Sequence, residues 1–425
     1  MQKRNRLKNL ILLLLFIAMI PLTALAWLSY LDTSSVPEDS IFASLYQRVT
    51  YGVNGFEIKT GNNPAAMPTR IAIKDEGKTN GAQYHEASVS VLYDAMYEVI
   101  GKALAAQGEF QSADLSELKQ SLKSDGIYFG YEGSLPISLL ANWMGQTSKE
   151  QTATDIIWLD ETGTLYIHTM NGFKKKSTNI NKWNVDVIKL PTNKCIFAAD
   201  DDMFQKIRPD TLIFENDIVH AEKYSVSIPD FLDAQNGTSL TNLLSAFSYD
   251  LYVNRYEENQ GQTMVFVEDY STLHVSKDGT VIFNASANEG GINVSNDPEY
   301  ANELNVQMDL AVTLVREVQN SMGDTSQAML YAITQNDDEK VFTFIQCIGG
   351  IPVKTEKPFA QLVIQNNKLM EARFELKNFN QTGAQTAVIP TRQAAVASNN
   401  ELFRLMLVYT QDEQMNFTAQ CVYRF

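Results

Sequence analysis

YANELNVQMDLAVTLVREVQNSM, residues 300–322, places apolar side chains three and four positions apart, the spacing of an amphipathic helix. The side chains that we expect to be buried are Leu304, Met308, Ala311, Val312, Val315 and Met322. Strand-like runs follow: AMLYAITQ and KVFTFIQCIG flank an acidic loop, and Asn366-Asn367 joins AQLVIQ to LMEARFELKNF as a hairpin turn. A short helix (TRQAAVASNN) and two strands (LFRLMLVYT, FTAQCVYRF) close the chain. This order predicts an α+β domain whose sheet is packed by helices on one face.

The middle of the chain has a similar mixture of helix and hairpin. TSLTNLLSAF (238–247) is a predicted helix, and three strand-like runs follow it, YDLYVNRYEE, QTMVFVED and YSTLHVSKDGTVIFNAS. The Asp278-Gly279 turn divides the last run into a hairpin. We expect a mostly-β domain here, and no internal repeat of the solenoid kind is visible.

The N-terminal third alternates helices and strands. Residues 87–106 predict a helix with one apolar stripe, and residues 111–124 and 136–144 predict two further helical stretches. The strand-like pieces are GIYFGY (126–131), TDIIWLD (154–160) and GTLYIHTM (163–170), of which the last two form a predicted hairpin.

An apolar run precedes all of these elements: LILLLLFIAMIPLTALAWLSYL, residues 10–31, holds no charged side chain. As a helix it would span roughly 33 Å, enough to cross a ~30 Å hydrocarbon core. Four basic residues between positions 3 and 8 favour a cytoplasmic N-terminus, so the chain from Asp32 onward is predicted to be exported. The positions that we assign to the membrane anchor are Leu10, Leu15, Ala18, Ile20, Ala24, Trp27 and Tyr30.

A cleaved signal peptide is the alternative interpretation of this run. Residues 10–20 form an apolar core of suitable length, and residues 24–26 (ALA) have the small-residue form of a cleavage site. The run continues past that site through Trp27 and Tyr30, which suit a membrane interface. We therefore expect an uncleaved single-pass anchor in the cell membrane, with cleavage after Ala26 as the alternative.

Taken together, these patterns predict an α+β protein with one N-terminal transmembrane helix and an exported ectodomain of mostly antiparallel sheets packed by helices. The expected segments are a cytoplasmic stub (1–9), the anchor (10–31), an N-terminal exported α/β domain (32–190), a middle mostly-β domain (191–295) and a C-terminal α+β domain (296–425).

Charge restricts the partners. The chain has 34 basic and 50 acidic residues, and the part after the apolar run would carry a net charge of about −20. Nucleic acid and anionic lipid surfaces are therefore excluded as direct ligands unless a local basic patch intervenes. The strongest such patch, Lys174-Lys175-Lys176, reads as a solvated turn.

The three cysteines, Cys195, Cys347 and Cys421, each lie in an apolar run. An exported protein that depended on disulfides would have more of them, so we expect buried free thiols, with a single bridge as the alternative.

No motif predicts catalysis or metal binding. The histidines (His85, His168, His220 and His274) lack the spacing of zinc ligands, and His168 and His274 lie in strand-like runs where a structural role is expected. Ser116 and Lys119 match the S-x-x-K motif of penicillin-binding proteins, but no K-T-G triplet exists, so we expect exposed neighbours on a helix.

Two acidic runs, residues 200–202 and 337–339, lack the register of a calcium loop and read as solvated turns. We predict no catalytic residue, no metal and no cofactor.

Three stretches together resemble a known family. They are residues 126–172, from GIYFGYEGSLPISLL to YIHTMNG, residues 243–286, from LLSAFSYDLYVNRYEE to TVIFNAS, and residues 342–379, FTFIQCIGGIPVKTEKPFAQLVIQNNKLMEARFELKNF. With the single anchor, they resemble the YycH/YycI-type regulatory proteins of a Gram-positive cell-wall two-component system. The third stretch, with its GGIP turn at 349–352, resembles the PepSY-like C-terminal module of those proteins.

The resemblance implies a non-enzymatic regulator that contacts a membrane-bound sensor histidine kinase through its transmembrane helix and exported domains, together with a second regulatory membrane protein. It supplies no active-site motif and no ectodomain binding residue. Two other classes stay open from the residues themselves: an exported ligand-binding or adhesion module, and a cell-wall hydrolase or transferase with a dispersed carboxylate site.

Overall fold

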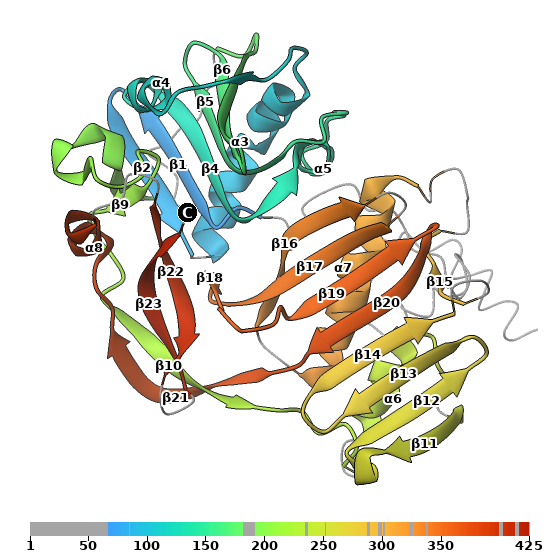
Figure 1. Ribbon diagram of the computed structural model, residues 1–425. Helices are drawn as coiled ribbons and strands as arrows, with labels where there is room; N and C mark the ends of the chain where they lie inside the picture. The colour runs from blue at the N-terminus through green and yellow to red at the C-terminus, as the bar shows by residue number, and fades with distance from the viewer. Residues whose placement is uncertain are drawn as a thin grey trace, which may run out of the picture.

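The computed structural model describes residues 67–84, 86–181, 192–233, 237–250, 252–286, 290–295, 300, 302–323, 326–336, 339–398, 403–412 and 416–424. Over these residues the chain is α+β, with three mostly antiparallel sheets and six α-helices (Figure 1). The predicted anchor, residues 10–31 with Leu10, Leu15, Ala18, Ile20, Ala24, Trp27 and Tyr30, lies outside them. Within the described ranges, no helix is long and apolar enough to cross a membrane.

The first sheet runs in the order β9-β8-β2-β1-β4-β5-β6-β7-β3, and every pairing in it is antiparallel. Its strands are β1 (Arg70–Asp75), β2 (Lys78–Gln83), β3 (Gln111–Ser112), β4 (Gly126–Pro136), β5 (Ala153–Asp160), β6 (Thr164–Thr169), β7 (Gly172–Ser177), β8 (Asn193–Phe197) and β9 (Leu212–Phe214).

Alternate residues of these strands face two cores, as the two-residue period of a strand requires. Ile71 and Phe129 join the core formed with α3 (Glu86–Ala105) and α5 (Ile137–Trp143). Their neighbours in sequence point to the opposite face, where a second core packs against α4 (Leu115–Ser121). Both faces of the first sheet are therefore covered.

The second sheet runs in the order β11-β12-β13-β14-β20-β19-β17-β16. Its strands are β11 (Asn254–Glu258), β12 (Thr263–Glu268), β13 (Ser271–Ser276), β14 (Thr280–Ala285), β16 (Gln327–Asn336), β17 (Glu339–Ile348), β19 (Ala360–Gln365) and β20 (Lys368–Glu375), with the short β15 (Ile292–Asn293) and β18 (Ile351–Pro352) at its margins. Helices α6 (Gly237–Ala246) and α7 (Leu304–Met322) both lie on one face of it and contact each other (Figure 1).

This second sheet consists of two copies of one arrangement, a helix followed by a four-stranded antiparallel meander. Helix α6 leads into β11 to β14, and α7 leads into β16, β17, β19 and β20. The last strands of the two copies pair antiparallel, from Thr280↔Glu375 to Asn284↔Glu371. The two copies are therefore related by an approximate two-fold axis between β14 and β20, and each covers an edge that the other would expose.

The third sheet runs in the order β21-β10-β23-β22 and brings together strands that are far apart in sequence. Its members are β10 (His220–Ser227), β21 (Asn378–Ala387), β22 (Arg404–Gln411) and β23 (Phe417–Arg424), and α8 (Thr391–Ala397) packs against β22 and β9. Val353, just after β18, forms a parallel bridge with Tyr409 of β22, which links the second and third sheets.

The fold class and most local elements match the sequence analysis. The predicted helix 300–322 is α7, and five of its six stripe residues are buried, with Leu304 partly exposed. The hairpins at Asp278-Gly279 and Asn366-Asn367 are also confirmed, and both asparagines adopt the positive φ that such a turn requires.

Three expectations differ from the structure. The two closing strands pair with β10 and β21 in a separate sheet instead of extending the sheet packed by α7. Residues 193–214 continue the first sheet, so the expected boundary at 190/191 does not coincide with a change of sheet. Residues 174–176 lie in strand β7 and not in a solvated turn, because they pair with β6 and β3. The buried Lys176 ammonium also donates to the carbonyls of Leu104 and Ala106 at the end of α3.

Candidate functional site

A bulge in β4 is where the first sheet meets the second. Strand β4 pairs with β5 up to Gly130 and again from Leu135, and the register shifts between them. The residues of the bulge turn toward β16, where Ser134 pairs with Ala332. Gly133 approaches the backbone of β16 so closely that a Cβ at this position would lie 1.7 Å from the Tyr331 carbonyl oxygen. This contact therefore requires glycine.

Charged side chains gather beside this bulge, at the contact between the first and third sheets. We call them the junction cluster: Arg70, Glu132, Asp155, His168, Arg208, Asp210 and Arg404. They come from β1, β4, β5, β6, the loop before β9 and β22. The three arginines and three carboxylates are all at most 9% exposed, which is rare for charged residues unless they are paired.

Arg208 is the best-paired cation of the cluster. Its guanidinium contacts both carboxylate oxygens of Asp210, at 2.8 and 3.2 Å. A third nitrogen, Nη1, lies 3.4 Å from Nε2 of His168. Arginine only donates, so Nε2 is assigned as the acceptor, and the ring proton resides on Nδ1. His168 then donates through Nδ1 to Asp155, at 2.7 Å.

Asp155 carries the network across to the third sheet. Its second oxygen lies 3.3 Å from Nη2 of Arg404, the first residue of β22. Burial by itself raises the pKa of Asp155, but the Arg404 guanidinium, the hydrogen bond from His168 and the Arg208 charge outweigh it and hold that pKa well below its usual range. The carboxylate is therefore charged in the folded protein.

Arg70 and Arg404 converge on one backbone oxygen. Their Nη2 atoms donate to the Tyr131 carbonyl in the bulge at 3.3 and 3.4 Å, so the two cations are close neighbours. Burial opposes the charge of Arg70, but Glu132, 3.4 Å away, raises its pKa above the ordinary value. Burial and then the Arg70 charge lower the pKa of Arg404. Arg404 is therefore the least compensated cation of the three.

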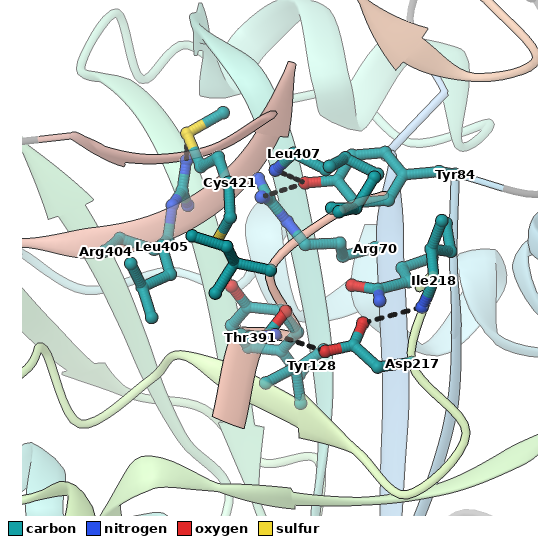
Figure 2. A pocket seen from close by; sticks show the side chains of 15 residues that line it. Arg70, Tyr84, Tyr128, Asp217, Ile218, Thr391, Arg404, Leu405, Leu407 and Cys421 are labelled. Carbon is teal, nitrogen blue, oxygen red and sulfur yellow. Dashed lines mark hydrogen bonds between the residues drawn. The ribbon is translucent and has the colours of Figure 1, made fainter. Parts of the chain in front are cut away.

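A small pocket lies beside these two arginines (Figure 2). Figure 2 shows Arg404 on one side of it and Arg70 with Tyr84 on the other. The Tyr84 hydroxyl accepts hydrogen bonds from Arg70 and from the backbone N–H of Leu407, at 3.3 and 3.0 Å. The space that a water-sized molecule can occupy is about 20 Å³, little more than one water requires. An organic substrate does not fit there.

The cluster joins the first sheet to the third through Arg404. The Asp155–His168 pair resembles the base and its orienting carboxylate in a hydrolase, but Nε2 of that histidine faces an arginine and not a nucleophile. No group of three or more His, Cys, Asp or Glu in the described part of the chain is arranged to hold a metal ion.

A second feature is the face of the second sheet that α6 and α7 leave uncovered (Figure 1). Its side chains alternate with the core residues of the same strands. We call this the open face; its partly exposed aliphatic members are Val267, Ile282, Val341, Ile345 and Val363. Arg373 and Glu375 add an ion pair at 2.6 Å among them. A sheet face of this mixed composition, which no described helix covers, is suited to contact with another protein.

The residues that the sequence analysis weighed take structural positions. Ser116 is exposed on α4 with Lys119 partly exposed, as expected for neighbours on a helix surface. Asp200 of the acidic run 200–202 pairs with the buried Lys74 at 2.5 Å, so this run is more than a solvated turn. His85 and residues 337–338 lie outside the described residues.

The remaining histidines and the cysteines all lie in strands, with His220 the exposed first residue of β10. His168 and His274 lie in β6 and β13, as expected. Cys195 and Cys347 are buried free thiols, whereas Cys421 is free but only partly buried. Burial raises the pKa of all three thiols, that of Cys421 to about 12, so none is a reactive thiolate.

The junction cluster was not predicted from the sequence. A usable signal was present: Arg70, Asp155 and Arg404 each stand at or near the start of a short apolar strand, in TRIAIKD, TDIIWLD and LFRLMLVYT. A charge inside a run that must be buried requires a partner of opposite charge. The partner, however, can lie far away in the sequence, as Asp155 does from Arg404, and only the fold identifies it.

Comparisons with known protein families, with characterised proteins and with solved structures return no match to this chain.

Proposed function

We propose that this chain is a non-enzymatic regulatory protein of the YycH/YycI type, anchored in the cell membrane by residues 10–31 with its other domains outside the cytoplasm, the C-terminal one a PepSY-like module. It modulates a sensor histidine kinase of an envelope two-component system by direct contact, with a second regulatory membrane protein as a further partner. The observation that carries the proposal is the open face, together with the sequence resemblance stated above.

The open face supports a protein partner by its chemistry. Partly exposed valine and isoleucine side chains from β12, β14, β17 and β19 lie on one continuous surface, interspersed with threonine and charged groups. Protein interfaces also combine apolar and polar contacts. The Arg70–Arg404 pocket, by contrast, has room for about one water.

Regulation by such a contact requires differential binding. The ectodomain shifts the kinase only if it binds one signalling state more tightly than the other, since equal affinity for both shifts nothing. A factor of ten in affinity corresponds to about 1.4 kcal/mol. In the anchor, the small residues Ala18 and Ala24 are the points where a kinase transmembrane helix could approach closely.

Site-specific photo-crosslinking tests the proposed surface. A photoreactive amino acid at Val363 or Ile282, on the open face, is expected to crosslink the full-length protein to a sensor histidine kinase in native membranes. The matched control is Arg316, which is exposed on the helix-covered side of the same sheet. Kinase adducts from neither face, or equally from both, would contradict the proposed contact.

The anchor has its own test. Mass spectrometry of the membrane fraction should find the intact N-terminal segment attached to the ectodomain. A mature chain that begins at Trp27 and appears in the medium would remove the membrane contact from the proposal.

A further inference from the structure

The pocket between Arg70 and Arg404 is lined by donors that have no acceptor within the described part of the chain. They are Nε of Arg70, Nε and Nη1 of Arg404, and the hydroxyl of Tyr128. All three side chains are at most 3% exposed. Buried donors without acceptors are costly, so their accumulation around one space points to something that accepts from them.

These donors are also close to one another. A Cβ on Gly130 would lie 2.9 Å from the Tyr128 hydroxyl and 3.2 Å from Nε of Arg70, so both groups border the small space that this glycine leaves. Arg404 shares the Tyr131 carbonyl with Arg70. Figure 2 shows the Tyr128 ring below and between the two arginines.

The nearby carboxylates do not satisfy these donors. Asp210, Asp155 and Asp217 each use both oxygens, on cluster side chains or on backbone N–H groups. Among the described residues, Arg70 and Arg404 each have a single ion-pair contact, at 3.4 and 3.3 Å, in contrast to the two-point pairing of Arg208.

We propose that this pocket binds one small inorganic anion of the size of chloride, held by Arg70, Arg404 and Tyr128. An anion accepts from all of these donors, whereas a water molecule would also need acceptors for its two hydrogens. The space that a water-sized molecule can occupy, about 20 Å³, is little more than one water requires, which favours a monatomic anion over the larger sulfate or phosphate. Because Arg70 belongs to the first sheet and Arg404 to the third, the bound anion ties the two sheets together. This inference does not depend on the proposed regulatory function.

Bromide, which scatters anomalously, identifies the site directly. Crystals of the full-length protein grown in bromide should show an anomalous peak in contact with Arg404 and Tyr128. Density for a water alone, or bromide only at other positions, would overturn the proposal.

Thermal unfolding measures the affinity. Replacing gluconate by chloride at constant ionic strength should raise the Tm by a few degrees along a saturating curve, since a ligand of the folded state stabilises by mass action. An equal rise with sulfate, or no rise at all, would contradict a selective small-anion site.

A matched pair of variants locates the effect. Tyr128→Phe removes one donor to the anion and should weaken the midpoint for chloride by about tenfold or more, the range for a hydrogen bond to a charged group. Tyr131→Phe is the control, because its buried hydroxyl also lacks a partner in the described residues but does not line the pocket. Both variants keep their ring, so both should fold. Equal chloride midpoints in the two variants would refute this location.

Discussion

Asp155→Asn tests whether the junction cluster stabilises the fold. The substitution keeps the shape of the side chain but removes the charge that lies 2.7 Å from His168 and 3.3 Å from Arg404. The hydrogen bond from His168 to the charged carboxylate is worth about 1.5–3 kcal/mol, of which asparagine retains part. Removing one partner of a buried ion pair costs about 3–5 kcal/mol, because the other charge stays buried. We therefore expect a loss of about 3 kcal/mol.

Calorimetry and hydrogen exchange are the appropriate assays, because a protein of three sheets need not unfold in two states. The Tm should fall by about 5–10 °C at neutral pH. Amides of β22 should lose protection more than those of β12 and β13, since Arg404 is the member of the cluster on β22. The depressed pKa of Asp155 also predicts a pH dependence. The stabilisation of the folded state by the Asp155 charge is complete above the unfolded pKa of about 3.9 and is lost as the pH falls further. The difference between wild type and variant should therefore shrink in acid.

Two control variants test whether the loss of stability comes from the buried Asp155–Arg404 pair. Glu98→Gln breaks an exposed pair with Lys102 at 3.8 Å and should change stability by less than about 0.5 kcal/mol. In an Arg404→Met background, Asp155→Asn should cost at least about 1 kcal/mol less, since the pair is then already broken. The reasoning is refuted if Asp155→Asn costs no more than Glu98→Gln, or if β22 keeps its full protection.

Three further outcomes are expected. Asp309→Asn should raise the Tm more at pH 8 than at pH 5. Burial raises the pKa of Asp309 to about 7, so the wild-type folded state loses stability as the pH rises toward and through 7. An effect of the substitution that does not change with pH would contradict the raised pKa. Gly133→Ala should lower the free energy of unfolding in urea by about 3 kcal/mol or more, because a Cβ would overlap a carbonyl of β16. The control Gly237→Ala has open space around it and should lower that free energy little. Similar losses in the two variants would show that the bulge can relax. The thiols of Cys195 and Cys347 should react with a thiol reagent only after denaturant is added, and rapid reaction of the native protein would contradict their burial.

Local structure could be predicted from the sequence because its causes are local. Apolar spacing predicted α3, α6 and α7, and the Asp278-Gly279 and Asn366-Asn367 turns predicted their hairpins, since side-chain period and turn chemistry depend on neighbouring residues. The α+β class followed from the order of these elements.

Strand partners could not be predicted in the same way. Strand β10 pairs with β21 across more than 150 positions, and no feature of HAEKYSVS specifies that partner. The two helix-and-meander copies share an arrangement but no visible sequence repeat, so the sheet that they form together was missed. The junction cluster depends on both, because its members become neighbours only after all three sheets are assembled.

The position of β1 has a mechanical consequence. It begins at Arg70, the first strand residue of the described chain, and it lies in the interior of the first sheet, paired with β2 over six residues and with β4 over five. A pulling force that arrives from the N-terminal side is therefore directed along a strand whose hydrogen bonds on both sides lie across the pull and must shear together. The same force reaches Thr69 and then Arg70, whose side chains donate to Glu132 and to the Tyr131 carbonyl in the bulge of β4. Tension applied at the N-terminus would thus act on the interior of the first sheet before it acts on any edge strand.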